Sequence, residues 1–157
     1  MRPSLVLLCL VLATPLAAQK SSAPALCPLL DPADVTPLLH GPHPATSAEG
    51  PFGCLWTSLG TNWVLTYNFE QPDPKKTASA QFDAMRAQNG SAARDESGLG
   101  DRAYSIYATY VVLVRGHILT FQVTTDDDRG MDDKQVVARY RDAGRPVVQK
   151  LVARIRD

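Results

Sequence analysis

The chain lacks the clustered residues on which most catalytic and metal-binding sites depend. Its 157 residues include 3 histidines and 3 cysteines. The sequence contains no Gly-x-Ser-x-Gly motif, and Gly98-Leu99-Gly100 lacks the third glycine of a dinucleotide-binding loop. We therefore predict no catalytic, cofactor-binding or metal-binding residue from motifs alone.

An excess of charge is also missing. The 16 lysines and arginines balance 16 aspartates and glutamates. Proteins that bind nucleic acid present a clustered basic face, so this balance argues against a nucleic-acid partner. Downstream of residue 18 no apolar run is long enough to cross a bilayer, which predicts no membrane span once the N-terminal segment is removed.

The one long apolar run lies at the N-terminus. Arg2 precedes an apolar stretch from Leu5 to Leu12, and small residues follow it up to Ala18. This order is typical of a secretory signal peptide, so we predict cleavage after Ala18, with an uncleaved anchor as the alternative. We expect residues 19–26 to be a flexible lead-in and residues 27–157 to form a single periplasmic or secreted domain.

Removal of residues 1–18 also removes Cys9, so the mature chain keeps Cys27 and Cys54. Paired cysteines in an oxidising compartment usually form a disulfide, which we predict here. Two free thiols are the alternative. Two cysteines without histidines at ligand spacing do not predict a zinc site.

Alternation of apolar and polar residues predicts the strands. In residues 62–69 every second residue is apolar and large, and shorter strands are expected at 54–57 and 102–107. The segments 110–114 and 117–125 flank Arg115-Gly116, which predicts a hairpin with a two-residue turn. Pairing of Val114 with His117 would place six apolar residues on one face: Tyr110, Val112, Val114, Leu119, Phe121 and Val123.

Three helices are expected between and after these strands. The first begins at Pro32 with Asp31 as its cap, and the second begins at Pro74, capped by Asp73, and ends at Asn89-Gly90. The segment 132–156 carries an apolar stripe with spacings of three and four, which predicts one kinked helix or two collinear pieces. Its members are Val136, Tyr140, Ala143, Val147, Leu151 and Ile155.

This order of elements predicts an α+β fold. The economical assembly is an antiparallel sheet of about five strands, with the helices packed on one face and a long C-terminal helix among them. The other face of the sheet would then show four polar side chains to water: Thr66, Asn68, Thr120 and Gln122.

Three groups of side chains are candidates for a metal or ligand site. His40 and His43 would clamp a metal across a loop, but solvated loop histidines are the simpler interpretation. Asp126–Asp133 is rich in carboxylates yet lacks the glycine and glutamate positions of a calcium loop, so helix capping explains it better. The aromatic row Trp63, Tyr67 and Phe69 lines either a ligand pocket or the core beneath a helix.

Short motifs spread along the chain resemble a family of uncharacterised bacterial secreted proteins and lipoproteins, common in actinobacteria. The segment from Cys27 to Val35, then Cys54-Leu55-Trp56, then Gly98-Leu99-Gly100-Asp101 carry the resemblance. It implies the same disulfide and fold but brings no known reaction. Because the chain has no lipidation cysteine, the resemblance does not imply membrane attachment.

The sequence favours a non-enzymatic exported domain that binds a protein partner or a small ligand of the envelope. The first alternative is an envelope enzyme such as a hydrolase, which would use the loops around His40, His43 and Asp126–Asp133. The second is an inhibitory or structural module that pairs with its target through a sheet edge.

Overall fold

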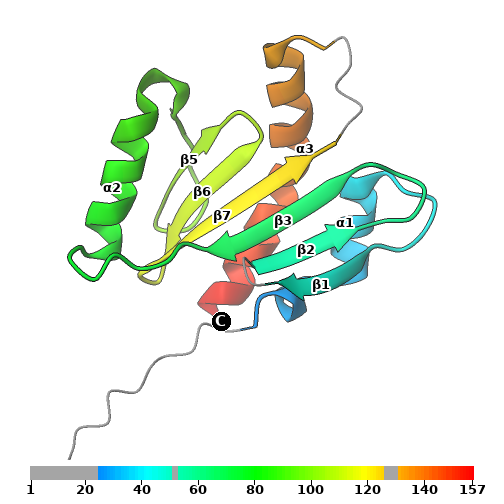
Figure 1. The fold of residues 1–157 in the computed structure, drawn as a ribbon, viewed down its shortest axis with the longest axis horizontal. Coiled ribbons are helices and arrows are strands. Elements are labelled where there is room, and N and C mark those ends of the chain that lie inside the picture. The colour runs from blue at the N-terminus through cyan, green and yellow to red at the C-terminus, as the bar shows by residue number, and fades with distance from the viewer. Residues whose placement is uncertain (1–24, 51–52, 126–130) are drawn as a thin grey trace, which may run out of the picture.

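The computed structural model describes residues 25–50, 53–125 and 131–157 (Figure 1). These residues form a seven-stranded antiparallel sheet in the order β1-β2-β3-β7-β6-β5-β4. The predicted α+β class, with its antiparallel sheet and long C-terminal helix, is confirmed. The strands are β1 (Thr46–Gly50), β2 (Gly53–Thr57), β3 (Val64–Phe69), β4 (Arg94–Asp95), β5 (Arg102–Ile106), β6 (Thr109–Val114) and β7 (His117–Thr124). The helices are α1 (Pro32–Leu39), α2 (Ala78–Asn89) and α3 (Asp133–Arg156), with 3₁₀ turns η1 (Cys27–Leu29) and η2 (Gly90–Ala92).

The sheet has two more strands than the sequence predicts, and both lie at its edges. All five residues of β1 are exposed, so the strand shows no alternation of apolar and polar positions. Strand β4 is 2 residues long, too short to produce a pattern. Edge strands with no buried face leave no periodic signal in a sequence.

The β6–β7 hairpin has the predicted register. Val114 pairs with His117, Val112 with Leu119 and Tyr110 with Phe121. Arg115 and Gly116 both have positive φ, as a two-residue turn of the I′ type requires. One face of this hairpin is therefore continuous with the apolar residues of β3.

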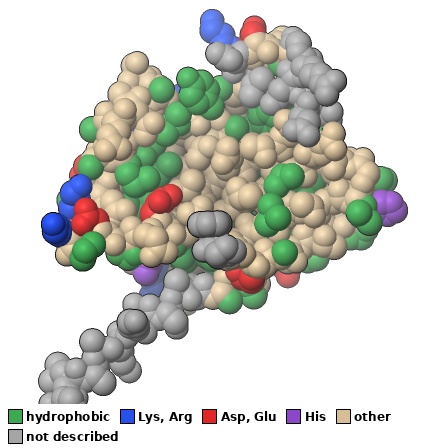
Figure 2. Space-filling model, viewed as in Figure 1, with side chains coloured by type: hydrophobic (Ala, Val, Ile, Leu, Met, Phe, Trp, Pro, Cys, Tyr) green, Lys and Arg blue, Asp and Glu red, His purple; other side chains and the backbone are tan. Residues whose placement is uncertain are grey.

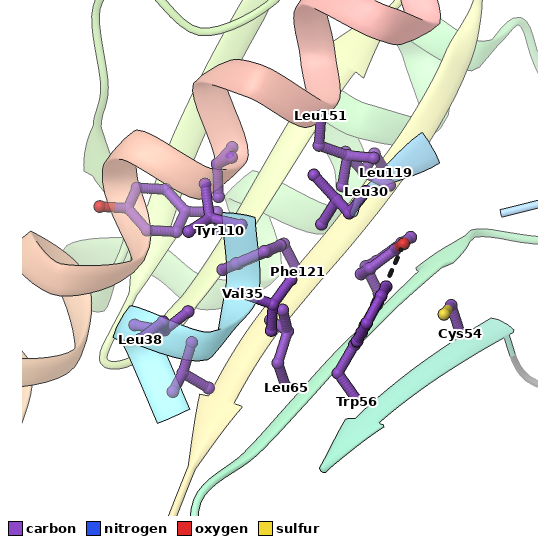
Figure 3. Packing of buried hydrophobic residues seen from close by; sticks show 14 of the residues in the cluster. Leu30, Val35, Leu38, Cys54, Trp56, Leu65, Tyr110, Leu119, Phe121 and Leu151 are labelled. Carbon is purple, nitrogen blue, oxygen red and sulfur yellow. Dashed lines mark hydrogen bonds between the residues drawn. The ribbon is translucent and has the colours of Figure 1, made fainter. Parts of the chain in front are cut away.

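Helices α1 and α3 pack on that apolar face and form the main core (Figure 3). Helix α3 is one continuous helix that contains Pro146, and its Tyr140, Val147 and Leu151 are buried. Leu65 and Phe121 beneath it are 0% exposed. The predicted burial of the α3 stripe is confirmed from Tyr140 to Ile155, where Ala143 and Ile155 are partly buried.

Helix α2 does not share this face, contrary to the expectation that the helices lie on one side. Its Phe82 packs edge-on against Tyr104, with ring centroids 5.1 Å apart, in a second cluster that includes Val111, Leu113 and Ile118. Consecutive positions of β6 are apolar because both of its faces are buried. The helix also starts later than predicted, because Thr77 rather than Asp73 accepts the capping hydrogen bond from the Ala80 amide.

The N-terminal segment is fastened to the sheet. Cys27 and Cys54 form the predicted disulfide, with Cα atoms 5.0 Å apart. The Cys27 amide donates to Glu49 Oε1 at 2.7 Å. The Tyr67 hydroxyl donates to the Leu26 carbonyl at 3.1 Å. These contacts join η1 to β1, β2 and β3.

Candidate functional site

The three histidines are exposed, and each makes different contacts. The His40 ring packs against the Trp63 ring with centroids 4.7 Å apart, and the His43 carbonyl accepts a hydrogen bond from Ser58. His117 begins β7 and packs against Phe69. Among the described residues no three His, Cys, Asp or Glu side chains are arranged to hold a metal ion. Most of the acidic run, residues 126–130, lies outside the described residues.

The predicted aromatic row is packed inside the protein. Trp63 and Tyr67 are 3% and 1% exposed, and Phe69 is partly buried against the core. The Trp56 indole N–H donates to the Tyr67 hydroxyl at 3.3 Å, the bond drawn in Figure 3. Burial raises the pKa of Tyr67 to about 12. The surroundings of Trp63 and Tyr67 are thus those of core residues.

Burial also raises the pKa values of Tyr104 and Tyr110, whereas the shifted pKa values of Asp83 and Asp95 belong to surface ion pairs. A hydrogen bond from Arg102 lowers the pKa of Asp83, and one from Arg86 lowers the pKa of Asp95. Both pairs connect α2 to the β4–β5 edge of the sheet. Their role is to hold α2 in place, which explains the shifts without catalysis.

The surface that the fold leaves uncovered is half of one sheet face. Helix α2 covers the β4–β5–β6 side and Ile118 at the start of β7, so no described helix lies over the outward residues of β1, β2, β3 and the rest of β7 (Figure 1). We call these residues the open face: Thr46, Ala48, Leu55, Thr57, Val64, Thr66, Asn68, Thr120, Gln122 and Thr124.

None of the open-face residues carries a charge, although 20% of the chain's residues are charged. Figure 2 views the molecule from this side and shows charged side chains gathered toward the margins of the surface. Glu70 borders the open face, where its carboxylate accepts a hydrogen bond from Thr120 at 2.6 Å. Leu55, near the middle of β2, is 40% exposed.

The alternation of residues in the sequence predicts part of this surface. It placed Thr66, Asn68, Thr120 and Gln122 on the outer side of the sheet, where they lie partly or fully exposed. The sequence does not predict β1, because its exposed residues show no alternation, and therefore does not predict the width of the surface. The register across four strands, which only the structure supplies, makes a continuous uncharged face.

No protein-family model, curated protein or solved structure matches the chain. Within the described ranges, no helix combines the length and hydrophobicity that crossing a bilayer requires. The function of the chain is therefore inferred from its own surfaces.

Proposed function

We propose that the chain is an exported, non-enzymatic domain that recognises a protein partner through its open face. The observation that carries this proposal is the absence of charge from the ten open-face residues of four adjacent strands. The cores of protein–protein interfaces are depleted of charged residues in the same way, because burying an unpaired charge is costly.

The side chains of the open face also suit binding. Five of the ten are threonines, and Val64 is β-branched as well. Such side chains are restricted at χ1 and lose little conformational freedom when a partner covers them. Their hydroxyl groups supply hydrogen bonds to a partner, while Leu55 and Val64 supply apolar contact area. The chemistry fits a partner surface that is itself uncharged.

Export is part of the same proposal. Residues 1–18 have the composition of a signal peptide, and the Cys27–Cys54 disulfide suits an oxidising compartment such as the periplasm or the exterior of the cell. The expected partner is therefore an envelope or secreted protein. The resemblance to actinobacterial secreted proteins is consistent with this location and remains a prediction.

The test places one charge on the open face, on the strand that lies next to β6. Gln122 is exposed on β7 and lies opposite Thr66, so Gln122→Lys changes the surface without touching the core. Envelope and secreted proteins of the source organism are passed over the immobilised chain with its disulfide formed. A captured partner is then purified, and its Kd is measured by calorimetry. We expect Gln122→Lys to weaken this binding at least about tenfold, because the partner would bury an unpaired ammonium group.

The matched control is Gln149→Lys, the same change at an exposed position of α3 on the opposite side of the sheet. Its Kd should stay within about twofold of the parent value, since surface changes away from an interface have small effects. Equal binding by the Gln122→Lys variant would reject the open face and favour pairing through the exposed edge strand β1. Capture of no partner would reject the proposal altogether.

A further inference from the structure

A second surface feature lies beside the first half of α3. A pocket of about 350 Å³ is lined by three cationic side chains, an aromatic ring and two small apolar side chains. Strand β4 contributes Arg94, and the turn between β5 and β6 contributes Tyr107. Helix α3 contributes Lys134, Val137, Ala138 and Arg141. The pocket is separate from the open face and from every site predicted from the sequence.

Two of the three cations have no ion-pair or hydrogen-bond partner among the described residues. Arg141 lies 3.1 Å from the carboxylate of Asp142. In contrast, the side chains of Arg94 and Lys134 make no ion pair or hydrogen bond with any residue that the structure describes. Apart from Lys75, every other described lysine or arginine side chain has such a partner. Two described cations without a carboxylate partner therefore line this one pocket.

Tyr107 occupies an unusual position for an aromatic residue. It lies in the two-residue turn between Ile106 and Thr109, has a φ of 51° and is 60% exposed. A left-handed conformation costs a bulky residue about 1 kcal/mol or more and is usually left to glycine or asparagine. Tyr107 also lines the pocket. Its exposed surface is available to a ligand in the adjoining pocket.

We infer that this pocket binds a small organic anion that carries a carboxylate or phosphate group on an aromatic or other apolar body. Arg94 and Lys134 would contact the anionic group, because a guanidinium and an ammonium both donate charge-assisted hydrogen bonds to such oxygens. Tyr107, Val137 and Ala138 would contact the apolar body. The inference does not depend on the protein-binding role of the open face.

The test uses three small probes with the full exported chain. Phenyl phosphate and benzoate carry the two anionic groups, and benzyl alcohol is the neutral analogue. Calorimetry at low salt should detect binding of at least one anion, and the stronger one identifies the group. We expect the double variant Arg94→Gln/Lys134→Gln to weaken binding at least about tenfold, and added salt to weaken it as well. The neutral analogue should not bind.

Two further variants separate the roles of the lining residues. Lys75→Gln removes a third cation that has no side-chain partner among the described residues and does not line the pocket, and it should leave the Kd unchanged. Tyr107→Asn keeps a residue that tolerates positive φ and should weaken binding of the aromatic anion but not of inorganic phosphate. The inference is overturned if neither anion binds, if benzyl alcohol binds equally well, or if Lys75→Gln weakens binding as much as the double variant.

Discussion

Gly98 and Gly100, two residues apart in the loop before β5, differ in what surrounds them. Both have positive φ, but nothing lies within 4 Å of a Cβ added at Gly98. A Cβ at Gly100 would lie 2.5 Å from Val112 Cγ1 and 2.6 Å from the Leu113 carbonyl oxygen. We expect Gly98→Ala to lower the free energy of unfolding by about 1 kcal/mol through backbone strain alone. Gly100→Ala should cost about 2–4 kcal/mol because steric overlap adds to that strain.

Urea unfolding of the two variants measures this difference. Equal losses at the two positions would show that the backbone conformation, not the close approach of β6, sets the requirement for glycine at Gly100.

The buried tyrosines give a second prediction at the scale of single residues. Tyr67→Phe would leave the Trp56 indole N–H and the Leu26 carbonyl without their partner. An unsatisfied buried polar group costs about 1–3 kcal/mol, and we expect a loss of that size in denaturant unfolding. The control is Tyr104→Phe, because the buried Tyr104 hydroxyl makes no hydrogen bond with the described residues. That variant should be as stable as the parent or more so; a large loss there would contradict the argument.

At the scale of elements, a group of ion pairs joins α1 to α3. Lys150 Nζ lies 2.7 Å from Asp34, and Arg154 lies 2.9 Å from the same carboxylate. The hydrogen bond from Lys150 is the largest cause that lowers the pKa of Asp34, with the Asp31 amide and Arg154 adding to it. The Asp34 carboxylate therefore stabilises the folded protein at pH values above the pKa of an unfolded aspartate, about 4.

Replacement of Asp34 by Asn tests this contribution through its pH dependence. The Tm of Asp34→Asn should lie below that of the parent at pH 7. As the pH falls below about 4 and then through the lowered folded-state pKa, the parent loses the contribution and the two melting temperatures should converge. A difference in Tm that persists unchanged to pH 2 would assign the effect to packing or to capping of α1. The Tm of Lys150→Gln should likewise depend less on pH than the Tm of the parent.

The elements that the sequence predicts well are those with one buried and one exposed face. Helix α3 and the β6–β7 hairpin repeat their apolar residues at the helical and strand periods, because each packs against the other. The sequence analysis predicts the wrong side of the sheet for α2. The consecutive apolar positions of β6 are a pattern that fits burial on both faces, as the structure shows. Strand β1 could not be predicted, because all five of its residues are exposed.

The two candidate binding surfaces also differ in how far the sequence predicts them. Alternation in β3 and β7 predicts the outward position of four of the ten open-face residues, Thr66 and Gln122 among them. The anion pocket combines Arg94, Tyr107 and Lys134 from three separate elements. No local period links these positions, and only the folded sheet brings them together.

At the scale of the whole molecule, the Cys27–Cys54 disulfide decides how firmly the N-terminal part is held. The bond closes a loop of sequence separation 27, and such a link stabilises a protein by about 3 kcal/mol in the chain-entropy model. We expect the double variant Cys27→Ser/Cys54→Ser to lower the free energy of unfolding by about this amount.

Hydrogen exchange locates the effect. Amides of η1 and β1 should lose protection in the double variant, because the Cys27 amide and Glu49 are held together next to the disulfide. Amides of β6, which lies inside the sheet and is buried on both faces, should lose protection only as far as global stability falls. Uniform loss over both regions would show that the disulfide stabilises the whole sheet equally.

The pairing of the first helix with the last has a consequence for when the chain can fold. Asp34 and Lys150 are separated by 116 residues, and the apolar side of the sheet is closed only by a helix that ends at Arg156. A growing polypeptide lacks that cover until the residues up to Arg156 have been made. The native packing of the sheet therefore forms late in synthesis, because its first helix must wait for its last.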